Sequence, residues 1–264
     1  MGRIIAIANQ KGGVGKTTTA VNLGACLAAA GRTVLLVDLD PQGNATSGVG
    51  LGKEEVDRGV YNSLCGDADW ENLLRSTEVA NLDVLPSTRD LTGASIELVE
   101  VERRESCLRD ALIPLRDEYD FTLIDCPPSL GLLTLNALTA AGSVLVPLQC
   151  EYYALEGVSE LMSTLELVKE ELNPGLVLEG ILLTMYDSRN NLSRQVQDEV
   201  RDFFHNQVFE AVIPRNVRLS EAPSFGRPIL LYDLQSKGSQ AYLMLSQEIL
   251  ARDSGTTPGK AAAG

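Results

Sequence analysis

Short apolar runs alternate along this chain with longer stretches of helical periodicity. The apolar runs, short enough for single buried strands, cover residues 4–8, 33–37, 121–124, 143–146 and 178–185, and on a less regular pattern 208–213. Helical stretches fill the gaps at 17–30, 106–116, 154–172 and 192–204. Strands that alternate with helices predict an α/β fold, a doubly wound and mostly parallel sheet flanked by helices.

Two stretches depart from this alternation. Residues 43–82 are Gly-rich and irregular, which predicts a loop with short helices. The end of the chain is rich in Gly, Thr and Ala, and we expect it to be disordered. The pattern therefore predicts a single domain over residues 1–252, followed by a tail over 253–264.

Composition agrees with a buried parallel sheet, because hydrophobic residues make up 44% of the chain and aromatic residues only 5%. The five cysteines are scattered without a CxxC pair, which argues against a cysteine-bound metal. No apolar run reaches the ~18 residues of a membrane span, and the first residues lack a signal-peptide pattern. These observations predict a cytoplasmic protein with reduced thiols.

A glycine-rich segment lies between the first predicted strand and the first predicted helix, where a phosphate-binding loop belongs. Its glycines allow backbone N–H groups to turn inward around an anion, and the helix N-terminus adds its dipole. Lys16 is placed to reach the β and γ phosphates, and the Thr17 hydroxyl to ligate Mg²⁺. The predicted nucleotide contacts are Lys11, Gly12, Gly13, Val14, Gly15, Lys16, Thr17 and Thr18.

Acidic residues follow two of the predicted strands. Asp38 and Asp40 come after the second strand, and Asp125 after a later one. Ligands of open α/β sheets bind beyond the carboxyl ends of the strands, so both acidic ends should face the phosphate loop. We predict that Asp125 holds Mg²⁺ directly or through water and that Asp38 is a supporting group.

The segment KGGVGKTT resembles the deviant Walker A motif of the ParA/MinD class of P-loop ATPases. It departs from the strict pattern, because Gln10 stands where that pattern has glycine and Lys11 is an additional lysine. Stretches 40–48, 151–157 and 213–224 are similar to chromosomal, Soj-type ParA partition proteins in particular.

This resemblance implies roles for individual residues. It implies that Lys11 reaches the nucleotide of a partner subunit, so that ATP is held between two protomers. It implies a catalytic set of Lys11, Lys16 and Asp40, with Asp40 positioning the attacking water and also near Mg²⁺, directly or through water. The remaining implied roles are base contacts from Pro214 and Asn216 and DNA contacts from Arg189 and Arg218.

The function that the resemblance implies is an ATP hydrolase of chromosome or plasmid partition, with slow intrinsic turnover. Its ATP-bound homodimer would bind double-stranded DNA without sequence preference, and a ParB-type partner would stimulate hydrolysis. Such a protein would be cytoplasmic and associated with the nucleoid. The formal net charge of −14 does not oppose this, because residues 186–240 hold seven acidic and seven basic residues and are neutral. Only one surface need be basic.

Other functions of the class stay open at this point. A MinD-like ATPase would act on a membrane surface, although the Gly/Ala-rich tail does not resemble a basic amphipathic helix and predicts no stable membrane anchor. The phosphate loop begins close to the first residue, so we expect no preceding helix-turn-helix unit and no specific operator binding. An amide ligase or an iron–sulfur reductase is a metabolic alternative, but Cys126 and Cys150 do not form an evident cluster pattern.

Overall fold

Seven strands form one sheet in the computed structural model of the chain, which describes residues 2–66, 70–151 and 154–253. The strand order is β3-β4-β2-β5-β1-β6-β7, and every neighbouring pair is parallel except β3 with β4. The strands are β1 (Arg3–Ile7), β2 (Val34–Asp38), β3 (Arg75–Ser76), β4 (Leu82–Leu85), β5 (Phe121–Asp125), β6 (Ser143–Gln149) and β7 (Val177–Thr184). The predicted α/β fold with a doubly wound, mostly parallel sheet is confirmed.

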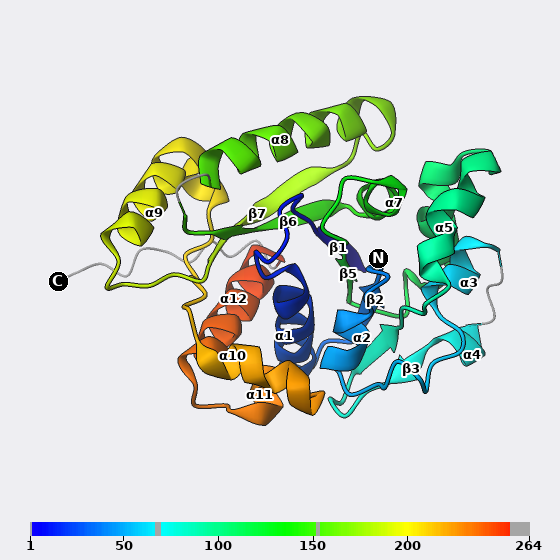
Figure 1. Cartoon of the computed structure of the whole chain (residues 1–264), viewed down its shortest axis with the longest axis horizontal. Helices are drawn as coiled ribbons and strands as arrows, with labels where there is room; N and C mark the ends of the chain where they lie inside the picture. Colours follow the sequence, from blue (N-terminus) through cyan, green and yellow to red (C-terminus); the bar gives the residue numbers. More distant parts are fainter. Residues whose placement is uncertain (1, 67–69, 152–153, 254–264) are drawn as a thin grey trace.

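Helices cover both faces of this sheet (Figure 1). The α-helices are α1 (Lys16–Ala29), α2 (Asn44–Gly48), α3 (Val60–Leu64), α4 (Trp70–Leu73), α5 (Leu91–Glu97), α6 (Cys107–Leu112), α7 (Leu132–Ala140), α8 (Ala154–Glu171), α9 (Asn191–Phe204), α10 (Val217–Glu221), α11 (Ile229–Tyr232) and α12 (Lys237–Asp253). Short 3₁₀ helices are η1 (Leu98–Glu100), η2 (Arg104–Ser106), η3 (Ile113–Leu115), η4 (His205–Gln207) and η5 (Ala222–Phe225).

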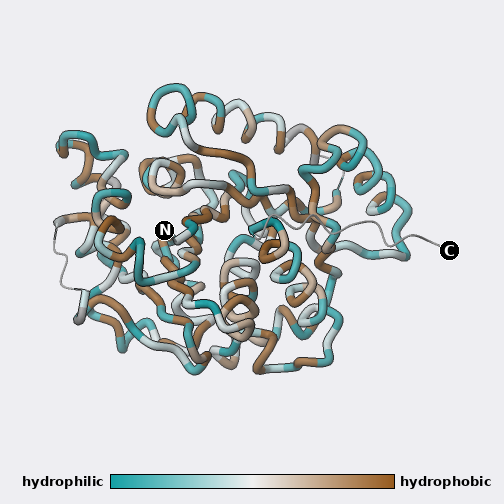
Figure 2. The backbone as a smooth tube through the Cα atoms, turned by 180° about the vertical axis from the view of Figure 1, so that it is seen from behind, coloured by the Kyte–Doolittle hydropathy of each residue, from teal (hydrophilic) through white to brown (hydrophobic). Residues whose placement is uncertain are grey.

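The core consists of two layers, one on each face of the sheet. Side chains of successive strand residues point to opposite faces, so Ile4 and Ala6 of β1 pack under α7 and α8, whereas Ile5 and Ile7 pack against α1 and α12. The strands are therefore hydrophobic on both faces, as expected for a parallel sheet between helices. Figure 2 shows the resulting distribution, with hydrophobic residues along the central strands and hydrophilic residues on the outer loops.

The register of the central strands brings their carboxyl ends to one level. β1 lies between β5 and β6, and Ile7 of β1 is opposite Asp125 of β5. β2 lies on the other side of β5, with Asp38 opposite Asp125. The loops that follow β1, β2 and β5 therefore meet at one edge of the sheet.

The helix ends follow local sequence signals. α1 stops where Gly31 adopts a φ of +83°, a conformation that glycine adopts without strain. α9 begins after Asn190, whose side chain accepts a hydrogen bond from the Leu192 N–H. Both boundaries were predicted from sequence to within a residue.

Several predicted elements differ from the structure. Residues 208–213 do not form a regular strand, because their pairing with β7 is limited to an isolated bridge between Ile181 and Val208 and to single hydrogen bonds from the Phe209 and Ile213 N–H groups. Of the helix predicted over 106–116, only α6 is α-helical, and it is flanked by η2 and η3. Pro114 lies in η3, which explains why α6 ends before it. The pattern missed β4, α5, α7 and α12. Of the tail expected over 253–264, Asp253 is the last residue of α12, and residues 254–264 lie outside the described residues.

Candidate nucleotide-binding site

The loop between β1 and α1 has the geometry of a phosphate-binding loop. Gly13 and Gly15 adopt φ angles of +75° and +91°, a left-handed region that any other residue would enter only with strain. Asn9 holds the start of the loop, because its Nδ2 donates to the Pro147 carbonyl at 2.8 Å and its Oδ1 accepts from the Lys11 N–H at 3.0 Å. The loop leads directly into α1, so its N–H groups and the helix dipole act on one anion.

Lys16 lies inside this loop. Its side chain is buried, and its Nζ donates to the Lys11 carbonyl at 3.0 Å. Burial lowers the pKa of Lys16, while the neighbouring Asp125 carboxylate opposes the shift. The loop is also tied to β7, where the Thr184 hydroxyl donates to the Val14 carbonyl at 2.9 Å. An ammonium held within a ring of backbone groups is suited to binding phosphate oxygens.

The two strand-end carboxylates differ in their hydrogen bonds. Asp38 is satisfied, since its Oδ2 accepts from the Thr46 N–H and hydroxyl, both at 2.7 Å. Within the described part of the chain, neither carboxylate oxygen of the fully buried Asp125 accepts a hydrogen bond of good geometry, and the Thr17 hydroxyl is the polar side-chain group close enough to act on it. Asp38 therefore supports the loop after β2, whereas Asp125 is left to bind a ligand.

Burial, and to a smaller extent the charge of neighbouring carboxylates, raises the pKa values of Asp38 and Asp125. Burial raises the pKa of Asp38 to about 6. Burial and then the charge of Asp38 raise the pKa of Asp125 well above its usual range, opposed by the Thr17 hydroxyl and the Lys16 ammonium. Buried carboxylates that repel each other are stabilised by a nearby cation, so the site is electrostatically matched to a metal ion.

The donor set fits Mg²⁺, which prefers oxygen ligands and binds through one or two carboxylates together with substrate phosphates and water. Asp125 and the Thr17 hydroxyl would hold the ion, directly or through water. Asp40 is also buried nearby, and its Oδ1 accepts from the Gln42 N–H at 2.9 Å. Across the described ranges, no group of three or more His, Cys, Asp or Glu side chains is arranged to hold a metal ion by itself.

A cavity of about 460 Å³ lies beside the loop and joins it to the predicted base contacts. Gly15 and Thr18 line one side, and Pro214 and Asn216 line another. The Asn216 side-chain oxygen caps α10 by accepting from the N–H groups of Arg218 and Leu219. Its Nδ2 therefore remains the side-chain group suited to contacting a base. The structure brings together two segments that are almost 200 residues apart in the sequence.

Some residues of this site were not predicted. Asn9, Thr184 and Tyr242 hold or line the loop and the cavity. Thr184 ends β7, so the rule that ligands bind at the carboxyl ends of strands could have found it. Tyr242 lies on α12, which the sequence pattern did not predict as a helix.

Lys11 lies apart from the interior of its own loop. Its ammonium pairs with the Glu151 carboxylate, and about half of its side chain is exposed. Gln10, next to it, donates to the Glu160 carboxylate on α8. Lys11 is therefore a cation at the rim of the site, while Lys16 is the cation within it.

The two predicted DNA-contacting arginines are exposed and paired with carboxylates. Arg189 binds Asp187 through two hydrogen bonds of 3.0 and 2.9 Å, and this contact lowers the pKa of Asp187 to about 2. Arg218 pairs with Glu221 at 2.8 Å and lies 3.5 Å from Asp233. Exposed pairs of this kind exchange partners at little energetic expense, so both guanidinium groups remain available to phosphates.

The fold and the phosphate loop together define a P-loop nucleotide-binding protein, and residues 2–178 match the family described as AAA domain. The chain is 61% identical over 258 residues to the chromosome partitioning protein ParA of Myxococcus xanthus (strain DK1622), covering 98% of this chain and 91% of that protein. It is 59% identical over 251 residues to the sporulation initiation inhibitor protein Soj of Bacillus subtilis (strain 168), covering 95% and 99% of the two chains. The chain belongs to the ParA/Soj family of chromosome-partitioning ATPases.

Solved structures agree with this assignment. The cobyrinic acid a,c-diamide synthase from Mycobacterium smegmatis with bound ADP and magnesium is 40% identical, with a TM-score of 0.86 and full coverage of both chains. The septum site-determining protein MinD from Pyrococcus horikoshii OT3, complexed with Mg-ADP, is 28% identical, with a TM-score of 0.79 and coverage of 98% and 100%. The protein is an ATPase that uses ATP and Mg²⁺. Identity is higher to the partition proteins than to the synthase, which favours partition over the metabolic alternative.

Proposed function

We propose that this chromosome-partitioning ATPase forms an ATP-dependent sandwich dimer that binds DNA without sequence preference and hydrolyses ATP when a ParB-type protein stimulates it. The observation that carries the proposal is the position of Lys11, a half-exposed cation at the rim of the phosphate loop. A second protomer facing this rim would receive Lys11 beside its own nucleotide. Dimerisation would then depend on ATP, because the phosphates supply the charge that attracts the lysine.

The chain's own residues would divide the work of hydrolysis. The loop N–H groups and Lys16 bind the phosphates, and Lys16 stabilises the negative charge that develops during phosphoryl transfer. Asp40 orients the attacking water, while Pro214 and Asn216 hold the base. The bound Mg²⁺ neutralises phosphate charge. Because positioning rather than covalent chemistry controls such a reaction, intrinsic turnover should be slow until a partner improves the geometry.

Replacing Lys11 by alanine should separate ATP binding from dimerisation. We expect the variant to bind ATP while the dimer's dissociation constant rises by at least about tenfold, the usual effect of losing a charged hydrogen bond. Sedimentation velocity with Mg·ATP measures this in an Asp40→Ala background, where hydrolysis should not end the dimer. Lys169→Ala, an exposed lysine on α8, serves as control. An unchanged dimer in the Lys11 variant would contradict the trans contact.

Reversing the charge of Arg218 should weaken DNA binding. We expect the affinity of the Arg218→Glu variant for random-sequence duplex DNA to fall about tenfold, with a shallower salt dependence, because each protomer loses a phosphate contact. Arg189→Glu should act in the same direction. Fluorescence anisotropy with Mg·ATP, Mg·ADP and no nucleotide measures the effect.

Arg89→Glu is the matched control for these charge reversals, since Arg89 is also exposed and paired with a carboxylate, that of Glu54. Tight binding of DNA only with ATP would support the proposal. Dimers that do not bind DNA but sediment with liposomes would favour a membrane-surface ATPase instead.

Among the described helices, none combines the length and the hydrophobicity that a membrane span requires. We place the protein in the cytoplasm, on the nucleoid, as part of this proposal.

A further inference from the structure

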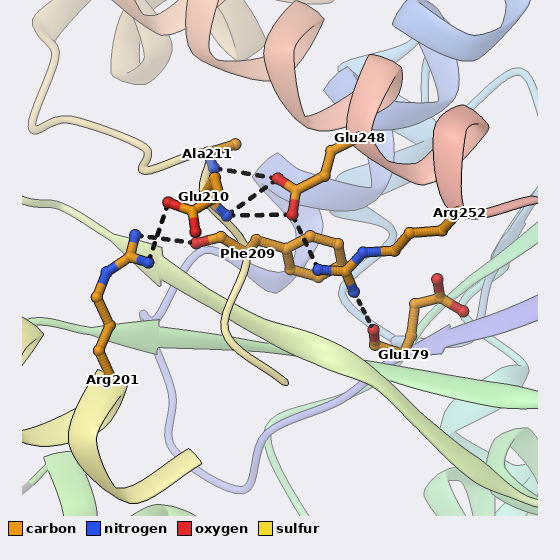
Figure 3. Close-up of polar contacts among 7 residues, drawn as sticks. All are labelled: Glu179, Arg201, Phe209, Glu210, Ala211, Glu248 and Arg252. Atoms are coloured by element: carbon orange, nitrogen blue, oxygen red, sulfur yellow. Dashed lines mark hydrogen bonds and ion pairs between the residues drawn. The ribbon is translucent and has the colours of Figure 1, made fainter. Parts of the chain in front are cut away.

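A carboxylate on the last helix holds the backbone that leads into the base-contacting loop (Figure 3). Glu248 of α12 accepts hydrogen bonds from the Glu210 N–H at 3.1 and 3.0 Å and from the Ala211 N–H at 3.2 Å. Its side chain is only 11% exposed. Two consecutive N–H groups that converge on one largely buried carboxylate fix both the position and the direction of the chain at that point.

Arg252 holds this carboxylate in place from one helical turn further along α12. Its Nη2 donates to Glu248 at 2.9 Å, and its Nη1 donates to the Glu179 carbonyl of β7 at 2.7 Å. Its guanidinium also lies 4.2 Å from the centre of the buried Phe209 ring. Gly180 leaves the required space, because a Cβ there would lie 2.7 Å from that ring. The ion pair of Glu248 and Arg252 is therefore held in one orientation by hydrogen bonds and by packing on Phe209, unlike an exposed ion pair on the surface.

The chain runs directly from this contact into the base cavity. The Ile213 N–H donates to the Leu183 carbonyl at 2.9 Å, and the Arg215 N–H donates to the Tyr186 carbonyl at 2.9 Å. Pro214 and Asn216, which line the cavity, therefore lie on a segment fixed at both β7 and α12. Residues 208–213 lack regular strand pairing. The Glu248 carboxylate therefore accepts the hydrogen bonds of the Glu210 and Ala211 N–H groups that a neighbouring strand would otherwise accept.

The same helix also contacts the element that carries the phosphate loop. The Tyr242 hydroxyl on α12 lies 3.2 Å from the Thr19 hydroxyl on α1, and both side chains are buried. α12 thus packs along α1, whose first turn follows the phosphate loop, and it also holds the segment that leads to Pro214. Through these contacts α12 sets the spacing between the phosphate and base subsites.

We propose that Glu248 is a positioning residue for the nucleotide base: through residues 210–213 it places Pro214 and Asn216 at the distance from the phosphate loop that adenosine requires. The inference rests on the proposed assignment of Pro214 and Asn216 as base contacts. A purely structural role for Glu248 would weaken the binding of all phosphate ligands alike. A positioning role weakens only those ligands that carry a base.

The test compares Mg·ADP with Mg·pyrophosphate, the same diphosphate without adenosine, by isothermal titration calorimetry on the full chain. We expect Glu248→Ala to lower the affinity for ADP about tenfold, the usual size of a lost charged hydrogen bond, while pyrophosphate affinity stays within about twofold. Glu248→Gln keeps one acceptor oxygen, so its affinity for ADP should lie between that of Glu248→Ala and that of the unchanged chain. Glu170→Ala, an exposed glutamate on α8, should bind both ligands as the unchanged chain does.

Three results would overturn the inference. Equal losses of ADP and pyrophosphate affinity in both Glu248 variants would show a general structural role. Unchanged ADP affinity in Glu248→Ala, with a clear loss in Asn216→Ala, would remove Glu248 from the site and leave the proposed base contacts standing. If Asn216→Ala and Glu248→Ala both bind ADP normally, the base assignment fails together with this inference. Thermal unfolding of each variant verifies that it is folded at the titration temperature.

Discussion

Replacing Lys16 by alanine is expected to lower the rate of ATP hydrolysis at least about 100-fold, the usual effect of removing a preorganised group that stabilises transition-state charge. Lys16 is buried in the loop and held by the Lys11 carbonyl, so its ammonium is already placed before the nucleotide binds. Its removal also takes away the ammonium that contacts the phosphates, which should weaken ATP binding as well.

Phosphate release measured with saturating Mg·ATP, in the presence and absence of DNA, checks this prediction. Calorimetric titration with Mg·ADP separates the loss of binding from the loss of turnover. The Lys169→Ala variant, which removes an exposed lysine on α8, should keep the original rate. A Lys16→Ala variant that is folded and hydrolyses ATP within threefold of the unchanged chain would show that phosphate charge is stabilised elsewhere.

Replacing Asp40 by alanine should lower hydrolysis by a similar factor, about 100-fold, but should leave ATP affinity nearly unchanged. The physical reason is that Asp40 is expected to orient the attacking water, a task needed in the transition state and not for binding. The phosphate loop and Asp125 remain in place to hold the phosphates and the metal ion. The variant should therefore accumulate as the ATP-bound species.

Single-turnover hydrolysis and equilibrium ATP binding together check this second prediction. Because the Asp40 carboxylate also accepts from the Gln42 N–H, Asp40→Asn is the companion variant that keeps an acceptor oxygen. Both variants should be slow if the charge of Asp40 is needed. A full rate in Asp40→Asn would mean that an uncharged acceptor is sufficient, and a full rate in both would remove Asp40 from the reaction.

The sequence predicted those parts of the site that depend on local pattern. The phosphate loop lies between a strand and a helix, and Asp38 and Asp125 end apolar strands, so their meeting follows from the geometry of a parallel sheet. The register of β2 with β5 places the two aspartates opposite each other. Residue roles that rest on family resemblance, including the DNA contacts of Arg189 and Arg218, remain predictions.

The parts that the sequence did not predict depend on tertiary contacts. α12 buries small and polar residues such as Gly238 and Ser246 beside Leu245, so its inward face lacks a clear apolar stripe. Residues 208–213 have a strand-like composition, but most of their partners are side chains and single bridges. The function of Glu248 is likewise invisible in sequence, because a glutamate on a helix is usually an exposed charge.

The manner in which β7 is covered has a consequence for self-association. An outer strand normally offers free carbonyl groups on which another chain can add a strand, which is a route to aggregation. Here the carbonyls of Glu179, Ile181 and Leu183 are taken by the Arg252 guanidinium and by the N–H groups of Phe209 and Ile213. These three positions are therefore closed to strand addition by a second copy. Strand addition at this edge would therefore not compete with the ATP-dependent association that we propose for the nucleotide-binding face.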